Sequence, residues 1–342
     1  MRRSTLLSCL SVVLLFSGLT AAVAETNSQL NLVLPAKIYN GYLVVVQGSI
    51  GNLEKRNLVI DTGAFPSVLD QDLARKLHLV GQKRELRVVE RNLQSRAVLL
   101  PTMQIGPLRA TNLQVMTQDL TPISEVFRVR IDALIGLDLL VHTSFRIDYV
   151  GKQVVFGPVD RMPFTAPIKW TDSMICVELK VNSRPTHLLV DTGAASVLLF
   201  ADRVPWARDI ADEIASYSNI GGQFRIHRIA AKSIEIAGSN LGPAPVFVSE
   251  AHNMSPFHFD GLLATGVLPV RQITFDMDRQ QFGWEPAATK SDTNRARAAN
   301  KRAISMALAA EAPSDVQASP CGGFGPGALC AMPVTVQGPP PR

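Results

Sequence analysis

Two aspartates follow apolar segments in almost the same short sequence. Residues 58–64 read LVIDTGA and residues 188–194 read LLVDTGA, so that Asp61 and Asp191 stand 130 positions apart. In each copy an apolar run ends at the carboxylate, and Gly63 or Gly193 allows a sharp turn two residues later. One such aspartate commonly hydrogen-bonds to its own turn. Two copies favour a shared site in which two carboxyl groups face each other.

Two carboxyl groups in contact have a distinct acid–base chemistry. They cannot both ionise, so the pair holds one proton between them. The ionised partner can take a proton from a water molecule while the protonated partner polarises a peptide carbonyl group. This hydrolyses a peptide bond without a metal ion or a covalent intermediate. We therefore predict Asp61 and Asp191 as the catalytic residues, with no cofactor and no metal.

The repetition extends beyond the two aspartates. Residues 132–140 (DALIGLDLL) correspond to 260–268 (DGLLATGVL), and 145–148 (FRID) to 273–276 (ITFD), both at an offset of 128. Ordered matches at a nearly constant offset indicate two copies of one fold on one chain. We expect one lobe over residues 25–160 and a second over 161–286, with the active site between them.

Each copy has the pattern of β-structure. Apolar, β-branched runs between turn residues predict strands, and a short helix is expected over residues 71–77. The predicted strands are 42–47, 58–60, 98–105 and 114–117 in the first copy, and 175–181, 187–190, 229–236 and 245–248 in the second. The predicted fold class is mainly β with minor helix.

Residues 30–286 resemble the aspartic peptidase superfamily, in particular bacterial retropepsin-like aspartyl proteases, but with both lobes on one chain as in pepsin-like enzymes. The family combines an apolar strand, Asp-Thr-Gly and a downstream apolar-apolar-Gly element, which here is 134–136 and ends at Gly136. The resemblance implies a bilobal acid-protease barrel fold of two pseudo-symmetric lobes and a peptide or protein substrate. It also implies that Thr62 and Thr192 brace the aspartate loops. With both lobes present, we expect a monomer.

The sequence departs from the family pattern near both aspartates. Ala264 replaces the glycine of the downstream element in the second lobe, and we expect it to be tolerated with some strain. Ala64 and Ala194 stand where pepsin-like enzymes tend to carry serine, whose hydroxyl would stabilise the ionised carboxylate. Their presence predicts a less acidic pH optimum.

Two segments are candidates for a flap that covers the substrate. In the first lobe, a hairpin over residues 86–99 is expected to turn near Arg91 and Asn92. In the second, residues 220–223 contain Gly221 and Gly222 and resemble the tip of a retropepsin flap. The alternative for the second segment is a plain surface turn.

The two ends of the chain differ from its body. Residues 1–24 combine two arginines, an apolar run and Ala-Val-Ala, which is typical of a cleaved signal peptide and predicts a periplasmic or extracellular protein without a membrane span after cleavage. Cys9 lies too early in that run for us to favour lipidation. Residues 287–342 form a basic tail rich in Ala, Pro and Gly, expected to be partly disordered. Cys321 and Cys330 within it could form a disulfide.

Charge and missing motifs exclude several other function classes. Of the net charge of +5, the signal segment carries two and the tail three, so the body has no net charge and is not expected to bind nucleic acid. His-Glu-x-x-His and Gly-x-Ser-x-Gly sequences are absent. Two alternatives to an active endopeptidase remain. One is a catalytically weak or inactive peptide-binding or regulatory module of the same fold, and the other is a scaffold whose basic tail docks on an acidic surface.

Overall fold

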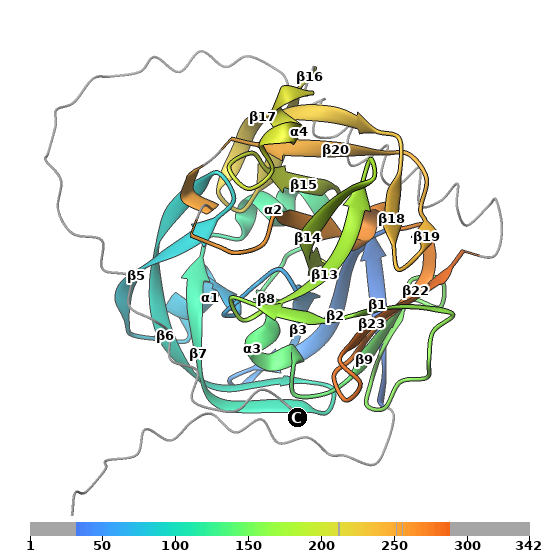
Figure 1. Cartoon of the computed structure of the whole chain (residues 1–342). Helices are drawn as coiled ribbons and strands as arrows, with labels where there is room; N and C mark the ends of the chain where they lie inside the picture. The colour runs from blue at the N-terminus through green and yellow to red at the C-terminus, as the bar shows by residue number, and fades with distance from the viewer. Residues whose placement is uncertain (1–31, 211–212, 251, 255, 288–342) are drawn as a thin grey trace, which may run out of the picture.

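The computed structural model describes residues 32–210, 213–250, 252–254 and 256–287. The predicted signal peptide, Cys9, the Cys321–Cys330 pair and all of the predicted tail except Ala287 lie outside the described residues. The chain is mainly β, as predicted, and its strands form two curled sheets (Figure 1). Among the described helices, none has the length and apolar character needed to cross a membrane.

The larger sheet contains most of the first lobe. Its strand order is β11 (Phe164–Pro167), β23 (Gln281–Pro286), β22 (Val270–Asp276), β9 (Phe145–Asp148), β10 (Gln153–Phe156), β1 (Leu32–Tyr39), β2 (Leu43–Ile50), β3 (Leu53–Ile60), β8 (Ala133–Ile135), β4 (Val68–Asp70), β7 (Leu108–Gln118), β6 (Arg91–Ile105) and β5 (Gly81–Val88). An extra pairing of β2 with β6 curls this sheet on itself.

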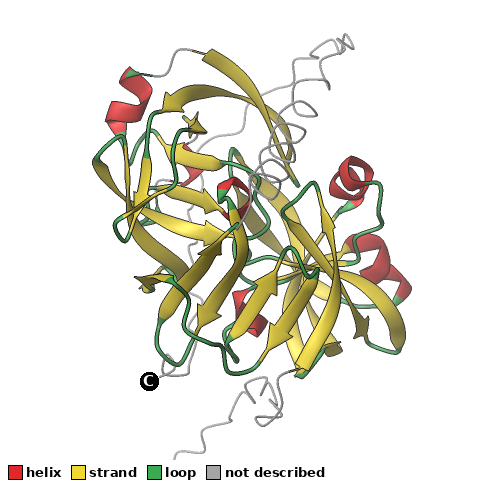
Figure 2. Ribbon diagram, turned by 90° about the vertical axis from the view of Figure 1, so that its right-hand side faces the viewer, coloured by secondary structure: helices red, strands yellow, loops and turns green. Residues whose placement is uncertain are grey.

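The smaller sheet forms the second lobe. Its strand order is β16 (Glu213–Asn219), β17 (Gly222–Ala231), β20 (Ala244–Ser249), β15 (Val197–Phe200), β21 (Gly261–Ala264), β14 (Arg184–Asp191), β13 (Met174–Val181), β18 (Ile234–Ile236) and β19 (Ser239–Asn240), with β12 (Lys169–Thr171) on β13. The helices are short, and Figure 2 shows helices in red among the yellow strands. They are α1 (Gln71–Lys76), α2 (Thr121–Phe127), α3 (Leu137–Leu140), α4 (Pro205–Asp209), η1 (His252–Met254) and η2 (Thr265–Val267).

The two lobes repeat one strand arrangement around the aspartates. In the first, β3 runs parallel to β8, β8 antiparallel to β4, and β4 parallel to β7. In the second, β14, β21, β15 and β20 follow the same sequence of parallel and antiparallel pairings. The internal repeat in the sequence is therefore a repeat of topology, and each Asp-Thr-Gly turn leaves the same point of its lobe.

A shared group of strands joins the lobes. Strands β11, β22 and β23 come from residues 161–286 but pair within the larger sheet, where β22 lies antiparallel to β9. Phe275 is opposite Phe145, with ring centroids 4.7 Å apart. Phe282 and Trp284 are also fully buried in this region. The sheets therefore do not divide at residue 160, because these strongly apolar strands are covered only when the two halves pair.

Most of the predicted elements are present, with different ends. The helix predicted over 71–77 is α1, whose N-terminus is capped by Asp70 through a 3.1 Å hydrogen bond from Leu73 N–H. The strand predicted over 229–236 is divided into β17 and β18. The strand predicted over 98–105 is the second half of β6, which begins at Arg91 because its first half belongs to a long hairpin with β5.

Candidate active site

The aspartate loops leave the ends of fully buried strands. Leu58, Val59 and Ile60 have no exposed surface, and the backbone N–H of Asp61 donates to Ile135 O at 3.0 Å. Asp191 is the last residue of β14 and pairs with Ala264 on β21. The neighbouring parallel strand holds each loop from behind, so the position of each carboxyl group is set by rigid backbone.

Thr62 and Thr192 brace the two loops against each other. The backbone N–H of Thr62 donates to Thr192 Oγ1 at 3.0 Å, and that of Thr192 donates to Thr62 Oγ1 at 3.1 Å. Each hydroxyl in turn donates to a carbonyl of the opposite lobe, at 2.7 Å: Thr62 to Val190 O and Thr192 to Ile60 O. Both side chains are completely buried. This is the role that the family resemblance implies for the threonines.

The structure brings the two carboxyl groups together. Each lies against the glycine of the opposite loop, and each accepts a hydrogen bond from its own loop: Gly63 N–H donates to Asp61 Oδ1 at 3.0 Å and Gly193 N–H to Asp191 Oδ1 at 2.7 Å. The glycines make the approach possible. A β-carbon on Gly63 would lie 2.5 Å from Cγ of Asp191, and one on Gly193 would lie 2.7 Å from Oδ1 of Asp61.

The environments of the two carboxyl groups are not equal. Burial, and then the charge of Asp191, raise the pKa of Asp61 well above its ordinary value. Burial also raises the pKa of Asp191, to about 6, although hydrogen bonds from the backbone N–H groups of Gly193 and Ala194 oppose this rise. Asp191 therefore accepts more backbone hydrogen bonds in its ionised form than Asp61 does, and the two carboxyl groups titrate as a coupled pair.

The region behind the first aspartate loop is a close-packed hydrogen-bonded unit. The backbone N–H of Gly136 donates to Ser67 Oγ at 2.9 Å, and that hydroxyl donates to Asp138 Oδ1 at 2.6 Å. A β-carbon on Gly136 would lie only 2.5 Å from Ala64 O, which explains the glycine. The prediction for Gly136 named the glycine but missed Ser67 and Asp138.

In the second lobe, the close packing behind the aspartate loop is made by a residue two positions after Ala264. Ala264 is fully buried and has ordinary extended backbone angles (φ −67°, ψ 131°), so the backbone strain expected there is absent. The close contact with the aspartate loop is made instead by Gly266, where a β-carbon would lie 3.2 Å from Ala194 O. The offset of 130 between the Asp-Thr-Gly copies relates Gly266 to Gly136 and could have identified it.

Tyr42 is a second residue near the site that the sequence did not single out. Its side chain is 8% exposed, and a β-carbon on Gly266 would lie 2.9 Å from its Cβ. Burial and the charge of Asp191 raise the pKa of the phenol. Its ring also meets Phe127 edge to face, with centroids 5.9 Å apart. Tyr42 thus forms part of the wall that shields Asp191 from water.

The two candidate flaps are both hairpins, and their tips lie together. In the β5–β6 hairpin the turn is Val89-Glu90, not Arg91-Asn92, because Arg91 already pairs with Val88. In the β16–β17 hairpin Asn219 pairs with Gly222, so the turn is Ile220-Gly221 and lies within the predicted segment. The tips meet where Asn219 Nδ2 donates to Val89 O at 2.8 Å.

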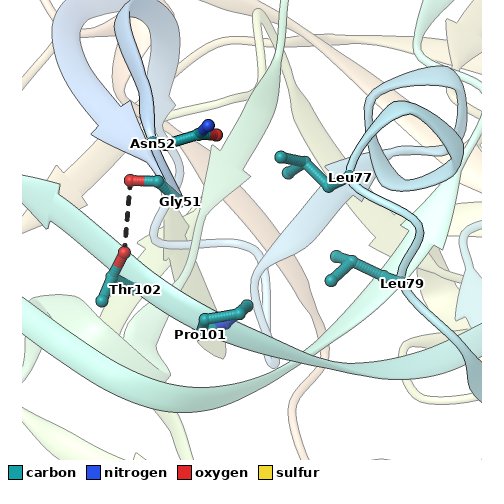
Figure 3. Close-up of a pocket in the computed structure, with 6 residues that line it drawn as sticks. All are labelled: Gly51, Asn52, Leu77, Leu79, Pro101 and Thr102. Atoms are coloured by element: carbon teal, nitrogen blue, oxygen red, sulfur yellow. Dashed lines mark hydrogen bonds between the residues drawn. The ribbon is translucent and has the colours of Figure 1, made fainter.

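A surface pocket lies on the first lobe, apart from the aspartate loops. Its volume is about 450 Å³, and Figure 3 shows its walls around a hydrogen bond from Thr102 Oγ1 to Gly51 O at 3.3 Å. The lining residues are Gly51, Asn52, Leu77, Leu79, Pro101 and Thr102. None of these belongs to the aspartate loops, so we assign the pocket no part in the chemistry. Among the described residues, no group of three His, Cys, Asp or Glu could hold a metal ion.

Comparison with known protein families agrees with this geometry. A family model described as aspartyl protease matches residues 46–139, a range that contains the first Asp-Thr-Gly turn, Gly136 and the strands that hold them. No curated protein matches the sequence at a significant level. The match covers the first lobe, and the mainly β structure with its two curled sheets is consistent with a bilobal acid-protease fold.

Proposed function

We propose that the protein is an aspartic endopeptidase in which Asp61 and Asp191 activate a water molecule for attack on a peptide bond. The observation that carries this proposal is the convergence of the two carboxyl groups, each of which is held by its own glycine N–H and lies against the glycine of the opposite loop. A structural role for turn aspartates would not require them to meet. The match of residues 46–139 to the aspartyl protease family model supports hydrolysis as the reaction class.

The unequal environments assign a role to each carboxyl group. Asp191, ionised and supported by two backbone N–H groups, takes a proton from the water molecule while the water oxygen attacks the carbonyl carbon. Asp61 donates its proton to the carbonyl oxygen, which gives a neutral tetrahedral diol. Asp191 then passes its proton to the amide nitrogen, the C–N bond breaks, and Asp61 regains a proton from the diol. The pair ends in its starting state.

We expect the pH optimum of cleavage to be less acidic than it would be for two carboxyl groups with ordinary pKa values. Activity requires one proton on the pair, so it falls when Asp191 becomes protonated below its pKa of about 6, and again when Asp61 loses its proton at higher pH. We expect the acid limb of kcat/KM near pH 6. Cleavage of a peptide mixture from about pH 4 to about pH 9 measures it. An acid limb at or below about pH 4 would show that burial does not raise the pKa of the base.

The close approach of Gly193 to Asp61 gives a second test. In Gly193→Ala the new methyl group would lie 2.7 to 3.0 Å from the Asp61 carboxyl atoms, so the carboxyl groups must separate. A displacement of that kind can reduce activity by roughly 100-fold. The cleavage rate and the circular dichroism spectrum should be measured together. Full activity in a folded Gly193→Ala protein would mean that the carboxyl groups do not work in this arrangement.

The alternative of an inactive peptide-binding module rested partly on Ala264. The structure accommodates this residue with ordinary backbone angles, and Gly266 supplies the close packing behind the second aspartate loop. The feature that favoured an inactive module is therefore not a defect of the site. Binding of peptides without cleavage at any pH between about 4 and about 9 would restore that alternative.

A further inference from the structure

The tip of the β5–β6 hairpin contains a residue whose backbone conformation is unusual for its type. Glu90 is the second central residue of the turn and has φ +74°. This position of a tight turn favours Gly or Asn, because a β-carbon is strained in the left-handed region. In the β16–β17 hairpin the equivalent position is Gly221, and the positive φ, +118°, falls on the next residue, Gly222. A strained residue that persists at a hairpin tip points to a compensating contact.

The compensating contact of Glu90 lies in the opposite lobe. Ser249, at the end of β20, donates its hydroxyl to Glu90 Oε1. The serine is 1% exposed and Glu90 is partly exposed, so the donor side of this hydrogen bond is shielded from water. A hydrogen bond from a hydroxyl to a charged carboxylate is stronger than one between neutral groups. The left-handed turn thus brings the carboxylate of Glu90 to the hydroxyl of Ser249.

Further contacts hold the two hairpin tips to each other. Asn219 Nδ2 donates to Val89 O at 2.8 Å, and the guanidinium of Arg91 lies 4.9 Å from the centroid of the Phe224 ring. Gly221 packs so closely that a β-carbon on it would lie 3.1 Å from Val88 Cγ2. These contacts all join the first lobe to the second, and each involves a residue at or next to a hairpin tip.

The joined tips lie over the side of the molecule that carries the aspartate loops. Leu86, Val88 and Leu93 of the first hairpin and Ile220 of the second belong to an apolar cluster separate from the main core. This cluster also contains Val59, two residues before Asp61, and Ala195, four residues after Asp191, together with Tyr42. The hairpins therefore pack over the surroundings of the aspartates.

We propose that Glu90, Ser249 and Asn219 form an interlobe latch that controls entry of the peptide substrate. The latch holds the substrate-free hairpins shut, and an extended peptide reaches the aspartates only in the fraction of molecules in which these hydrogen bonds are broken. The apparent affinity for substrate is reduced by that fraction. The effect on cleavage rests on the proposed function, whereas the latch itself does not.

Hydrogen exchange in the full chain without substrate tests the latch directly. Ser249→Ala removes the buried donor without altering the hairpin, and we expect exchange of the amides in residues 86–93 to rise about 3- to 10-fold. Glu90→Gly should give the same rise although glycine suits the left-handed turn better. Ser95→Ala is the matched control, because Ser95 lies on the same hairpin and is 6% exposed but donates to Thr117 O of its own lobe at 2.6 Å. Unchanged exchange at the tip in Ser249→Ala and Glu90→Gly would overturn the latch.

Peptide cleavage provides the second readout. Ser249→Ala should lower KM by about the same 3- to 10-fold and leave kcat unchanged, because only the population of open molecules changes. A KM that is unchanged or higher in the presence of faster tip exchange would overturn control of entry. If the unaltered protein cleaves no peptide, the proposed function fails, whereas faster tip exchange in Ser249→Ala would still establish the latch.

Discussion

Replacing Asp61 or Asp191 by asparagine is expected to abolish peptide cleavage and to stabilise the fold at neutral pH. Both carboxyl groups act as one unit, so either substitution should reduce kcat by roughly 10⁴-fold or more, and the double variant should be little worse than either single one. The free energy of unfolding should rise because asparagine keeps the shape and an acceptor oxygen of aspartate but has no charge to bury.

The sign of the stability change follows from the raised pKa values. In the folded state the pKa of Asp191 is about 6 instead of 3.8, and that of Asp61 is also raised. The protonated pair favours folding fully below about pH 4, and this contribution is lost as pH rises through the folded-state pKa values. Asp191→Asn should therefore raise the free energy of unfolding by about 1–3 kcal/mol near pH 8 and by almost nothing near pH 4.

Chemical denaturation at several pH values, alongside peptide cleavage, measures both effects. Asp160→Asn is a suitable control, because the side chain of Asp160 is 94% exposed and should influence neither cleavage nor stability. An Asp191→Asn variant that still cleaves peptides at more than a few per cent of the normal rate would remove this residue from the mechanism. A variant that is less stable than the unaltered protein at pH 8 would contradict the raised pKa.

Loss of a threonine hydroxyl at the brace is expected to have the largest effect on stability. In Thr192→Val the side chain keeps its shape, but Thr62 N–H loses its acceptor and Ile60 O loses its donor. Each buried polar group left without a partner costs about 1–3 kcal/mol. We therefore expect the free energy of unfolding to fall by about 2–5 kcal/mol, with loss of cleavage because the aspartate loops are no longer held together.

Two further variants make this test specific. Thr192→Ser retains the hydroxyl and should keep most of the stability and activity. Thr186→Val removes a hydroxyl that is equally buried but donates only within its own hairpin, to Leu179 O at 3.3 Å, and should cost about 1 kcal/mol. If Thr192→Val lowers the free energy of unfolding no more than Thr186→Val does in thermal or chemical denaturation, the hydrogen bonds of Thr62 and Thr192 are not a principal stabilising contact between the lobes.

The sequence predicted those features of the fold that the internal repeat records. The matching sequences around Asp61 and Asp191 predicted two similar lobes, and the structure shows the same strand pairings in each. The mainly β class followed from short apolar runs between turn residues. These features were accessible because they depend on local pattern and on a comparison of the chain with itself.

The features that sequence reasoning missed depend on contacts between distant segments. The turn at Val89-Glu90 lacks the glycine that often marks such a turn, and the contact of Glu90 with Ser249 of the other lobe is not visible in the local sequence. Tyr42 approaches the second aspartate loop only through the packing of the lobes. Gly266 was not predicted because the downstream elements of the two copies match at an offset of 128, whereas the Asp-Thr-Gly segments match at 130. The strands that join the lobes were likewise assigned to the second lobe alone, since no local pattern shows which sheet a strand enters.

A carbon-13 NMR titration of the aspartate side-chain carboxyl groups in the full chain tests the central claim most directly, because it needs no substrate. We expect Asp61 and Asp191 to titrate as a coupled pair, with the pKa of Asp191 near 6 and that of Asp61 also raised above its ordinary value, and we expect the Asp191 curve to simplify to a single step in Asp61→Asn. Two independent single-step titrations near the ordinary value of about 4, unaffected by substitution of the partner, would contradict the shared proton and with it the proposed mechanism.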